Sequence, residues 1–274
     1  MISALRRTRN EARFLPQVLA MDIRVQESLS TYFRRRRHTA LLIAVVIAFA
    51  VRPLIGDAGS ALIAFSLALL TLMLVALYTI RVDELVGERG VLLARRRMQS
   101  IVGWVLATLA IAERLALLIA PSPQLFIAGS IGWLLFFSFV TWSQLRSLLI
   151  QREVTRETIG LSISVYLLLG LCWGLLYIVI FLSQPQAFSF GGSPELGGVL
   201  AAYPEHTFPI FMYFSLTTLS TIGFGDITPV TLQARYAAVA EGITGQFYLA
   251  ILVARLVGMQ MSGSGRSGHE EPTP

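Results

Sequence analysis

Six runs of apolar residues, several of them near twenty residues long, constrain what this chain can fold into more than any other feature. A helix that crosses the hydrocarbon core of a bilayer needs about 20 mostly apolar residues. The composition agrees, because 55% of the residues are hydrophobic, 14% are charged and the mean hydropathy is +0.68. The sequence therefore predicts an all-α membrane protein with six transmembrane helices, at about residues 39–51, 60–80, 99–120, 124–145, 159–182 and 229–258.

The basic residues, all 22 of them arginines, are distributed unevenly between the two sides of the predicted spans. Nine precede the first span, five lie between the second and third, and three lie between the fourth and fifth. The loops on the other side carry only Arg52. Because basic residues are enriched in cytoplasmic loops, this pattern predicts a multi-pass protein of the plasma (inner) membrane with both termini in the cytoplasm.

The amino-terminal segment, residues 1–38, is basic and partly amphipathic, and two interpretations of it stay open. It is either a helix lying on the cytoplasmic leaflet or a disordered basic tail. In the first case Arg34, Arg35, Arg36 and Arg37 would contact anionic lipid headgroups. The net charge of +6 and the pI near 10 would also suit nucleic acid, but the arginines lie beside apolar runs and therefore indicate topology. We expect no nucleic-acid partner.

Residues with chemical reactivity are scarce in this sequence. The single cysteine, Cys172, lies inside an apolar run, so no intrachain disulfide framework is possible. Nucleophilic triads and clusters of cysteine and histidine are both missing, so we expect neither an enzyme nor a bound cofactor.

The loop between the last two predicted spans contains, at residues 213–229, a short apolar helix followed by a turn in which glycine alternates with larger residues. The helix is expected over about 207–220, with Pro209 in its first turn. Gly223 and Gly225 allow backbone angles that a β-carbon disfavours, so consecutive carbonyl groups can face one axis. Rings of carbonyl oxygens replace the water around a dehydrated alkali cation. Because one chain supplies one loop, a closed ring requires about four copies.

This turn resembles the selectivity filter of tetrameric potassium channels, whose pattern is T-x-G-[Y/F]-G-D. The matching residues are Thr221, Ile222, Gly223, Phe224, Gly225 and Asp226. The resemblance extends over residues 161–258 and implies a homotetramer with a re-entrant pore helix and filter between helices five and six. It also implies that potassium, the permeating ion, binds at Thr221, Ile222, Gly223 and Phe224. An ordinary turn after a buried helix is the alternative, since glycine and aspartate are common turn residues.

The surroundings of the predicted filter depart from the common pattern of that family. Tyr213 and Phe214 stand where many members have tryptophans, and Thr217 stands where some have a glutamate behind the filter. Phe224 lacks the hydroxyl of the commoner tyrosine. The hydrogen bonds around the filter must therefore differ from those of such members.

A carboxylate in the last span, Glu241, is expected to compensate for part of this difference. Alignment through the filter places it behind the filter, where an unpaired carboxylate would be costly. We expect it to accept hydrogen bonds from Thr217, Thr218 or Ser220 and so to support the filter.

The rest of the last span carries the residues expected to control the pore. Gly245, with Gly242 one turn earlier, falls where the resemblance places a gating hinge, although glycines in membrane helices are also common packing residues. Leu249, Val253 and Val257 recur every four residues and by resemblance line the inner vestibule, where they could gate by dewetting. A lipid-facing or inter-helix stripe would give the same pattern.

The first four spans are predicted to form a bundle that does not sense voltage. A voltage sensor needs several arginines at three-residue intervals on one helix, and the span at 124–145 has none within it. Glu113 and Arg114 are the charged residues inside this bundle. They are either a structural clamp, in which Arg52 pairs with Glu113, or a site for an unknown modulator.

The sequence therefore predicts four segments, namely a basic segment at 1–38, a four-helix bundle at 39–150, a pore domain at 159–259 and a short cytoplasmic tail at 260–274. The tail is too short for a regulatory domain. The predicted function is passage of potassium down its electrochemical gradient. A weakly selective monovalent cation channel is one alternative, and a non-conducting membrane receptor or structural bundle with a vestigial pore loop is another.

Overall fold

The computed structural model of this protein describes residues 37–55, 59–86, 92–119, 122–151, 155–193 and 195–264. The predicted interfacial helix at 1–38 lies almost wholly outside the described residues, as does the end of the tail at 265–274. The lipid contacts of Arg34–Arg37 therefore stay a prediction.

Helices occupy all six segments in which spans were predicted. They are α2 (Arg37–Ile55), α3 (Gly59–Val86), α4 (Leu92–Ile119), α5 (Pro123–Ile150), α6 (Arg156–Ser183) and α9 (Leu232–Ser264). The segment between α6 and α9 holds η1 (Pro185–Ala187), β1 (Phe188–Phe190), α7 (Leu196–Ala202), η2 (Pro204–His206), α8 (Thr207–Leu219) and β2 (Ile227–Pro229). Helix α8 agrees closely with the short helix predicted over 207–220.

Three of these helices contain stretches long and apolar enough to cross a membrane, namely Pro123–Ile150, Arg156–Ser183 and Leu232–Arg255. In α2, α3 and α4 the described apolar stretches are shorter, at His38–Val51, Ser66–Ile80 and Ile101–Glu113. The chain is thus a helical membrane protein with three candidate spans among its described residues. Six spans remain a proposal.

The starts of α5 and α6 follow from their capping residues. The hydroxyl of Ser122 accepts a hydrogen bond from the backbone N–H of Leu125 at 3.2 Å, and Pro123 occupies the first position of α5. Thr155 and Thr158 form a reciprocal capping box at the start of α6. These caps satisfy N–H groups that the first turn of a helix leaves without partners.

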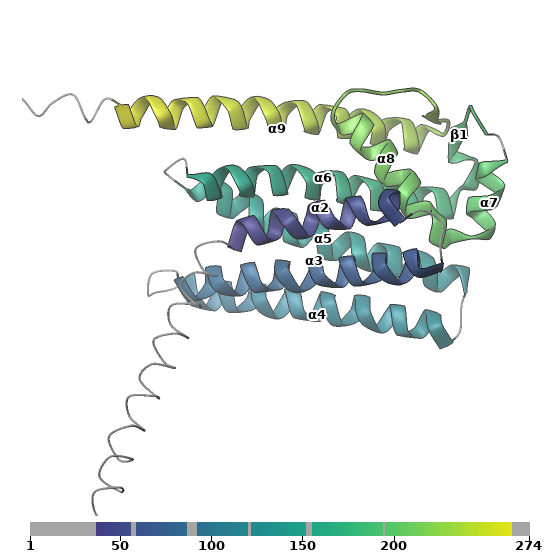
Figure 1. Ribbon diagram of the computed structural model, residues 1–274, viewed down its shortest axis with the longest axis horizontal. Coiled ribbons are helices and arrows are strands. Elements are labelled where there is room, and N and C mark those ends of the chain that lie inside the picture. Colours follow the sequence, from purple (N-terminus) through teal and green to yellow (C-terminus); the bar gives the residue numbers. More distant parts are fainter. Residues whose placement is uncertain are drawn as a thin grey trace, which may run out of the picture. The chain divides into compact units, whose positions relative to one another are not determined.

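The long helices pack side by side, as Figure 1 shows, with α3 against α4, α4 against α5 and α5 against α6. Helix α8 is short and lies at one end, in contact with both α6 and α9. The hydroxyl of Thr39 donates to Glu157 Oε1 at 2.6 Å, so the amino ends of α2 and α6 lie together. Helices α2 and α6 therefore begin on the same side of the bundle.

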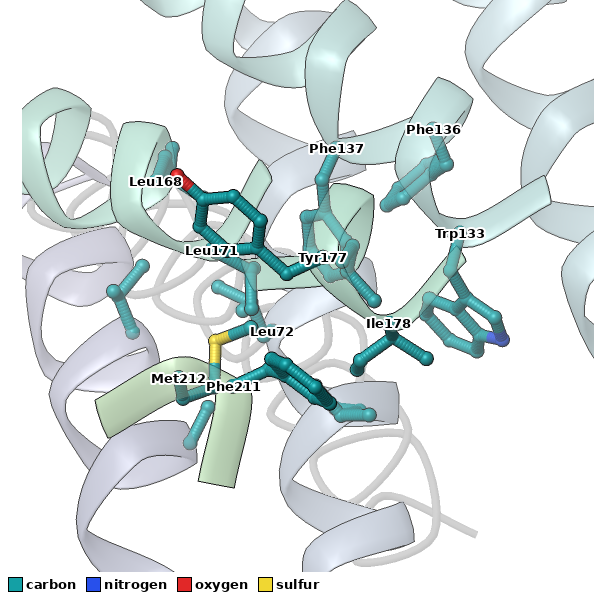
Figure 2. Close-up of a cluster of buried hydrophobic side chains, with 14 of the residues drawn as sticks. Leu72, Trp133, Phe136, Phe137, Leu168, Leu171, Tyr177, Ile178, Phe211 and Met212 are labelled. Carbon is teal, nitrogen blue, oxygen red and sulfur yellow. The ribbon is translucent and has the colours of Figure 1, made fainter. Parts of the chain in front are cut away.

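A cluster of buried aromatic side chains from α5, α6 and α8 forms one part of the core, which also contains aliphatic residues of α2 and α3. Figure 2 shows Trp133, Phe136 and Phe137 of α5 near Tyr177 of α6 and Phe211 of α8. All five are buried, and the rings of Trp133 and Phe137 stack with their centroids 5.7 Å apart. This packing fixes α8 against α6 and so positions the loop that follows α8.

Two short strands, which the sequence did not predict, join the segments before α7 and after the candidate filter. β1 pairs antiparallel with β2, and Ser189 lies opposite Thr228. The pairing places the residues just after α6 beside the carboxyl-terminal end of the loop that follows α8.

Candidate functional site

The loop Thr221–Asp226 follows α8 directly and is hydrogen-bonded back to the end of that helix. The backbone N–H groups of Ile222 and Gly223 both donate to the Thr217 carbonyl, at 2.9 and 3.1 Å. The N–H of Thr221 donates to the Thr218 carbonyl at 3.0 Å. The first N–H groups of the loop are thus turned toward α8, and none of these bonds uses a carbonyl group of the loop.

The backbone of this loop alternates in conformation. The φ angles of Thr221, Gly223 and Gly225 are 59°, 54° and 81°, in the left-handed region. Glycine enters this region without the steric penalty that a β-carbon brings, which agrees with the role expected for Gly223 and Gly225. Among the described residues, Thr221 is the one non-glycine with a positive φ. An alternation of this kind is what a segment needs if its carbonyl groups are to face one side.

The side chains of the loop are largely exposed in a single chain. Ile222 is 59% exposed and Phe224 is 68% exposed. Phe224 stacks on Tyr213 of α8, with ring centroids 6.1 Å apart and an interplanar angle of 2°. The hydroxyl of Tyr213 donates to Asp226 Oδ2 at 2.9 Å. Tyr213 therefore contacts both the middle and the carboxyl-terminal end of the loop.

The backbone at the carboxyl-terminal end of the loop is held by the segment around β1. The N–H of Gly191 donates to the Asp226 carbonyl at 3.0 Å, and the N–H of Val230 donates to the Ala187 carbonyl at 2.8 Å. Phe188, between these two bonds, is buried against Phe211 of α8 with ring centroids 4.9 Å apart. Asp226 is thus fixed through its side chain by α8 and through its backbone by the β1 segment.

Glu241 of α9 packs against α8, is completely buried, and contacts one hydroxyl group through each of its two carboxyl oxygens. The Tyr177 hydroxyl of α6 contacts Glu241 Oε2 at 2.5 Å, and the Ser215 hydroxyl of α8 contacts Oε1 at 2.5 Å. One carboxyl group therefore joins three helices.

The partners predicted for Glu241 were wrong. The hydroxyls of Thr217 and Thr218 both donate to the Phe214 carbonyl, at 2.9 and 2.8 Å, and that of Ser220 donates to the Leu216 carbonyl at 2.6 Å. Hydroxyl side chains in helices readily bond to the carbonyl three or four residues earlier, and these three do so.

Gly245 lies where α9 approaches the end of α8. A β-carbon at this position would overlap the carbonyl oxygen of Leu219, which also accepts a hydrogen bond from the Tyr166 hydroxyl at 3.2 Å. At Gly242 the nearest atom to an added β-carbon is the Thr218 carbonyl oxygen, at 4.0 Å. Close packing is therefore a sufficient reason for glycine at Gly245, and the gating hinge stays a prediction.

Substituting the two glycines separates packing from hinge bending. Gly245→Ala should disrupt assembly or current, because overpacking a tight contact costs about 1–3 kcal/mol per copy. Gly242→Ala should have the smaller effect, since it meets only ordinary contact distance. Size-exclusion chromatography in detergent and potassium flux measure both. Equal effects of the two variants on channel opening, with normal assembly, would instead favour a hinge formed by both glycines.

Sequence reasoning missed Gln246, which follows Gly245. Its Nε2 donates to Thr221 Oγ1 at 3.4 Å, so α9 reaches the first residue of the loop. An uncharged polar residue in an apolar helix was the available signal. Tyr177 and Ser215 were missed in the same way.

For the remaining predicted residues, the structure gives positions or contacts at most and does not indicate a role. Leu249, Val253 and Val257 are exposed on α9 in a single chain, which fits either a pore-lining or a lipid-facing stripe. Glu113 packs so closely over Gly129 of α5 that a β-carbon there would overlap its carboxyl group. The side chains of its predicted partner Arg52 and of Arg114 lie outside what the structure describes.

Comparison with known proteins gives an independent indication of function. Residues 165–261 match a family model described as "Ion channel". Protein LctB of Geobacillus stearothermophilus is 30% identical over 91 residues, which cover 33% of this chain and 62% of LctB. The chain thus matches less than two thirds of that relative. No solved structure matches the chain. The family match indicates an ion channel, and not an enzyme, over the part of the chain that contains α8, the loop and α9.

Proposed function

We propose that this protein is a potassium-selective channel formed by four copies of the chain. Thr221, Ile222, Gly223 and Phe224 would bind potassium through backbone carbonyls and the Thr221 hydroxyl, and Gly225 and Asp226 would complete the filter. The observation that carries the proposal is the alternating positive φ at Thr221, Gly223 and Gly225, together with N–H groups turned back toward α8.

Two further features support an assembly of several copies. Ile222 and Phe224 are large apolar side chains that are exposed in one chain, and neighbouring copies would cover them. Helix α8 ends at the loop, so its negative dipole end would favour a cation there.

In the proposed topology the chain crosses the plasma (inner) membrane six times, and both termini lie in the cytoplasm. It is supported by the arginine distribution and by the contact between the amino ends of α2 and α6, which a six-span chain places on one side. Residues 39–150 would then form the bundle around the pore, and Arg34–Arg37 would be free to contact anionic lipids.

Ion flux into liposomes that contain only this protein tests the proposal. Potassium and rubidium should enter while sodium does not, because the carbonyl rings come from an uninterrupted T-I-G-F-G segment. Equal potassium and sodium flux would instead identify a weakly selective cation channel. No flux from a correctly assembled oligomer would identify a receptor or a structural bundle.

A further inference from the structure

The inner half of α9, which follows Gly245, is anchored to α5 and α6 along one face. The Tyr248 hydroxyl donates to the Ser162 carbonyl of α6 at 2.6 Å. Leu252, one turn later, packs on a buried cluster of Leu148 from α5 with Leu161 and Val165 from α6. Because residues three and four apart lie on the same side of a helix, Arg255 continues this face.

Arg255 makes three hydrogen bonds with the carboxyl end of α5. Its Nη1 donates to the Leu148 carbonyl at 2.5 Å, and its Nη2 donates to the carbonyls of Leu149 and Gln151 at 2.9 and 2.5 Å. The last carbonyls of a helix lack partners within the helix and carry its negative dipole end. A guanidinium, with five donors and a fixed charge, suits this position particularly well.

The anchored face points away from the predicted pore-lining residues. At 3.6 residues per turn, the mean direction of Tyr248, Leu252 and Arg255 lies roughly 130° around the helix from that of Leu249, Val253 and Val257. The latter three are exposed in a single chain. The inner half of α9 therefore contacts α5 and α6 through one face, and the predicted pore-lining residues lie on a different face of the same helix.

We propose that Arg255 is a positioning residue that holds the inner half of α9 outward against α5 and so keeps the inner end of the pore open. This inference rests on the proposed channel function. Helix α5 is the last helix of the 39–150 bundle. Arg255 therefore also links that bundle to α9, so a movement of the bundle would be transmitted to the pore. Loss of the contact releases the inner half of α9 toward the axis, where Val253 and Val257 close the pore.

Single-channel recording of the full chain in planar bilayers tests this inference with Arg255→Gln. Open probability should fall about fivefold or more, as is typical when coupling between two elements is lost. The permeability ratio of potassium to sodium should not change, because the filter contacts are intact. Arg255→Lys keeps the charge but not the fork of donors, and should restore part of the open probability. Tyr248→Phe, which removes one hydroxyl, should lower open probability less.

Arg156→Gln is the matched control, because it removes an exposed arginine near the same ends of α5 and α6 and should leave open probability unchanged. An unchanged or raised open probability in Arg255→Gln would overturn the inference. If Arg255→Gln does not assemble, Tyr248→Phe replaces it in the test. An unchanged or raised open probability in Tyr248→Phe would then overturn the inference.

A second readout does not require current. Spin labels on Val257→Cys, in a Cys172→Ser background, should lie closer to those of the other copies after Arg255→Gln. Unchanged label distances would also overturn the inference. Wild-type protein without potassium flux would contradict the channel function, whereas these distances test Arg255 separately.

Discussion

Gly223→Ala should abolish potassium-selective flux while the protein still assembles. Gly223 has a φ of 54°, and in one chain an added β-carbon would meet no atom within 4 Å. The expected cost is therefore conformational, about 1–2 kcal/mol for an L-residue held in the left-handed region. In the proposed tetramer every copy would carry this cost at the same level of the proposed filter. Potassium and sodium flux into liposomes, with size-exclusion chromatography for assembly, measure the outcome.

Gly132→Ala provides the matched control for that experiment. Gly132 lies within α5, without a positive φ, and its added β-carbon also meets nothing within 4 Å. Alanine is favoured over glycine inside a helix by roughly 0.5–1 kcal/mol, so this variant should keep flux and selectivity. If Gly223→Ala kept wild-type selectivity, the backbone conformation of this loop would not be the source of selectivity.

The helices could be predicted from the sequence because their cores are continuous apolar runs. The run predicted at 159–182 became α6, Arg156–Ser183, which is longer at its start because Thr155 and Thr158 provide a cap. The last span was expected from residue 229, but α9 begins at Leu232. The preceding residues Ile227–Pro229 form β2 instead, since they pair with β1. Hydropathy alone does not reveal such a pairing.

The candidate loop was also predictable, because its glycine spacing is tied to its backbone conformation. The positive φ of Thr221 was not predictable from residue type, since threonine disfavours that region. Arg255 was missed for another reason. Its partners are backbone carbonyls, which every residue has, so no residue type in the sequence marks the contact.

Glu241 was predicted to lie among hydrogen-bonding hydroxyls and is buried in contact with two of them, but which hydroxyls these are depends on how three helices are rotated against one another. Tyr177 is 64 residues away and Ser215 is 26 residues away. Residue spacing cannot give the rotation of α6 and α8, whereas the three predicted hydroxyls, those of Thr217, Thr218 and Ser220, had acceptors in the backbone of α8. The three-helix arrangement around Glu241 now allows a sharper prediction than the sequence did.

The three contacts around Glu241 need three hydrogens, and the hydroxyls of Ser215 and Tyr177 supply two. The Ser215 hydroxyl lies within hydrogen-bond distance of both the Gly170 carbonyl, at 2.7 Å, and Glu241 Oε1, at 2.5 Å, but it has one hydrogen. The Tyr177 hydroxyl supplies the hydrogen for Oε2. All three contacts are satisfied when the carboxyl group carries a proton and donates to Ser215. A glutamine reproduces this pattern, because its amide donates to Ser215 and its carbonyl accepts from Tyr177.

Glu241→Gln should therefore keep the assembled protein and its potassium selectivity, whereas Glu241→Ala should lose stability or selectivity. Alanine leaves the buried Tyr177 hydroxyl without an acceptor, which costs about 1–3 kcal/mol per copy, and removes the link between α6, α8 and α9. Tyr177→Phe in the Glu241→Ala background removes the stranded hydroxyl and should recover part of the lost stability. Thermal stability in detergent and the potassium-to-sodium flux ratio distinguish the variants. If Glu241→Ala behaved like wild type while Glu241→Gln sharply reduced unitary conductance, Glu241 would act on the permeating ions through a negative charge, and its role as a structural link would be wrong.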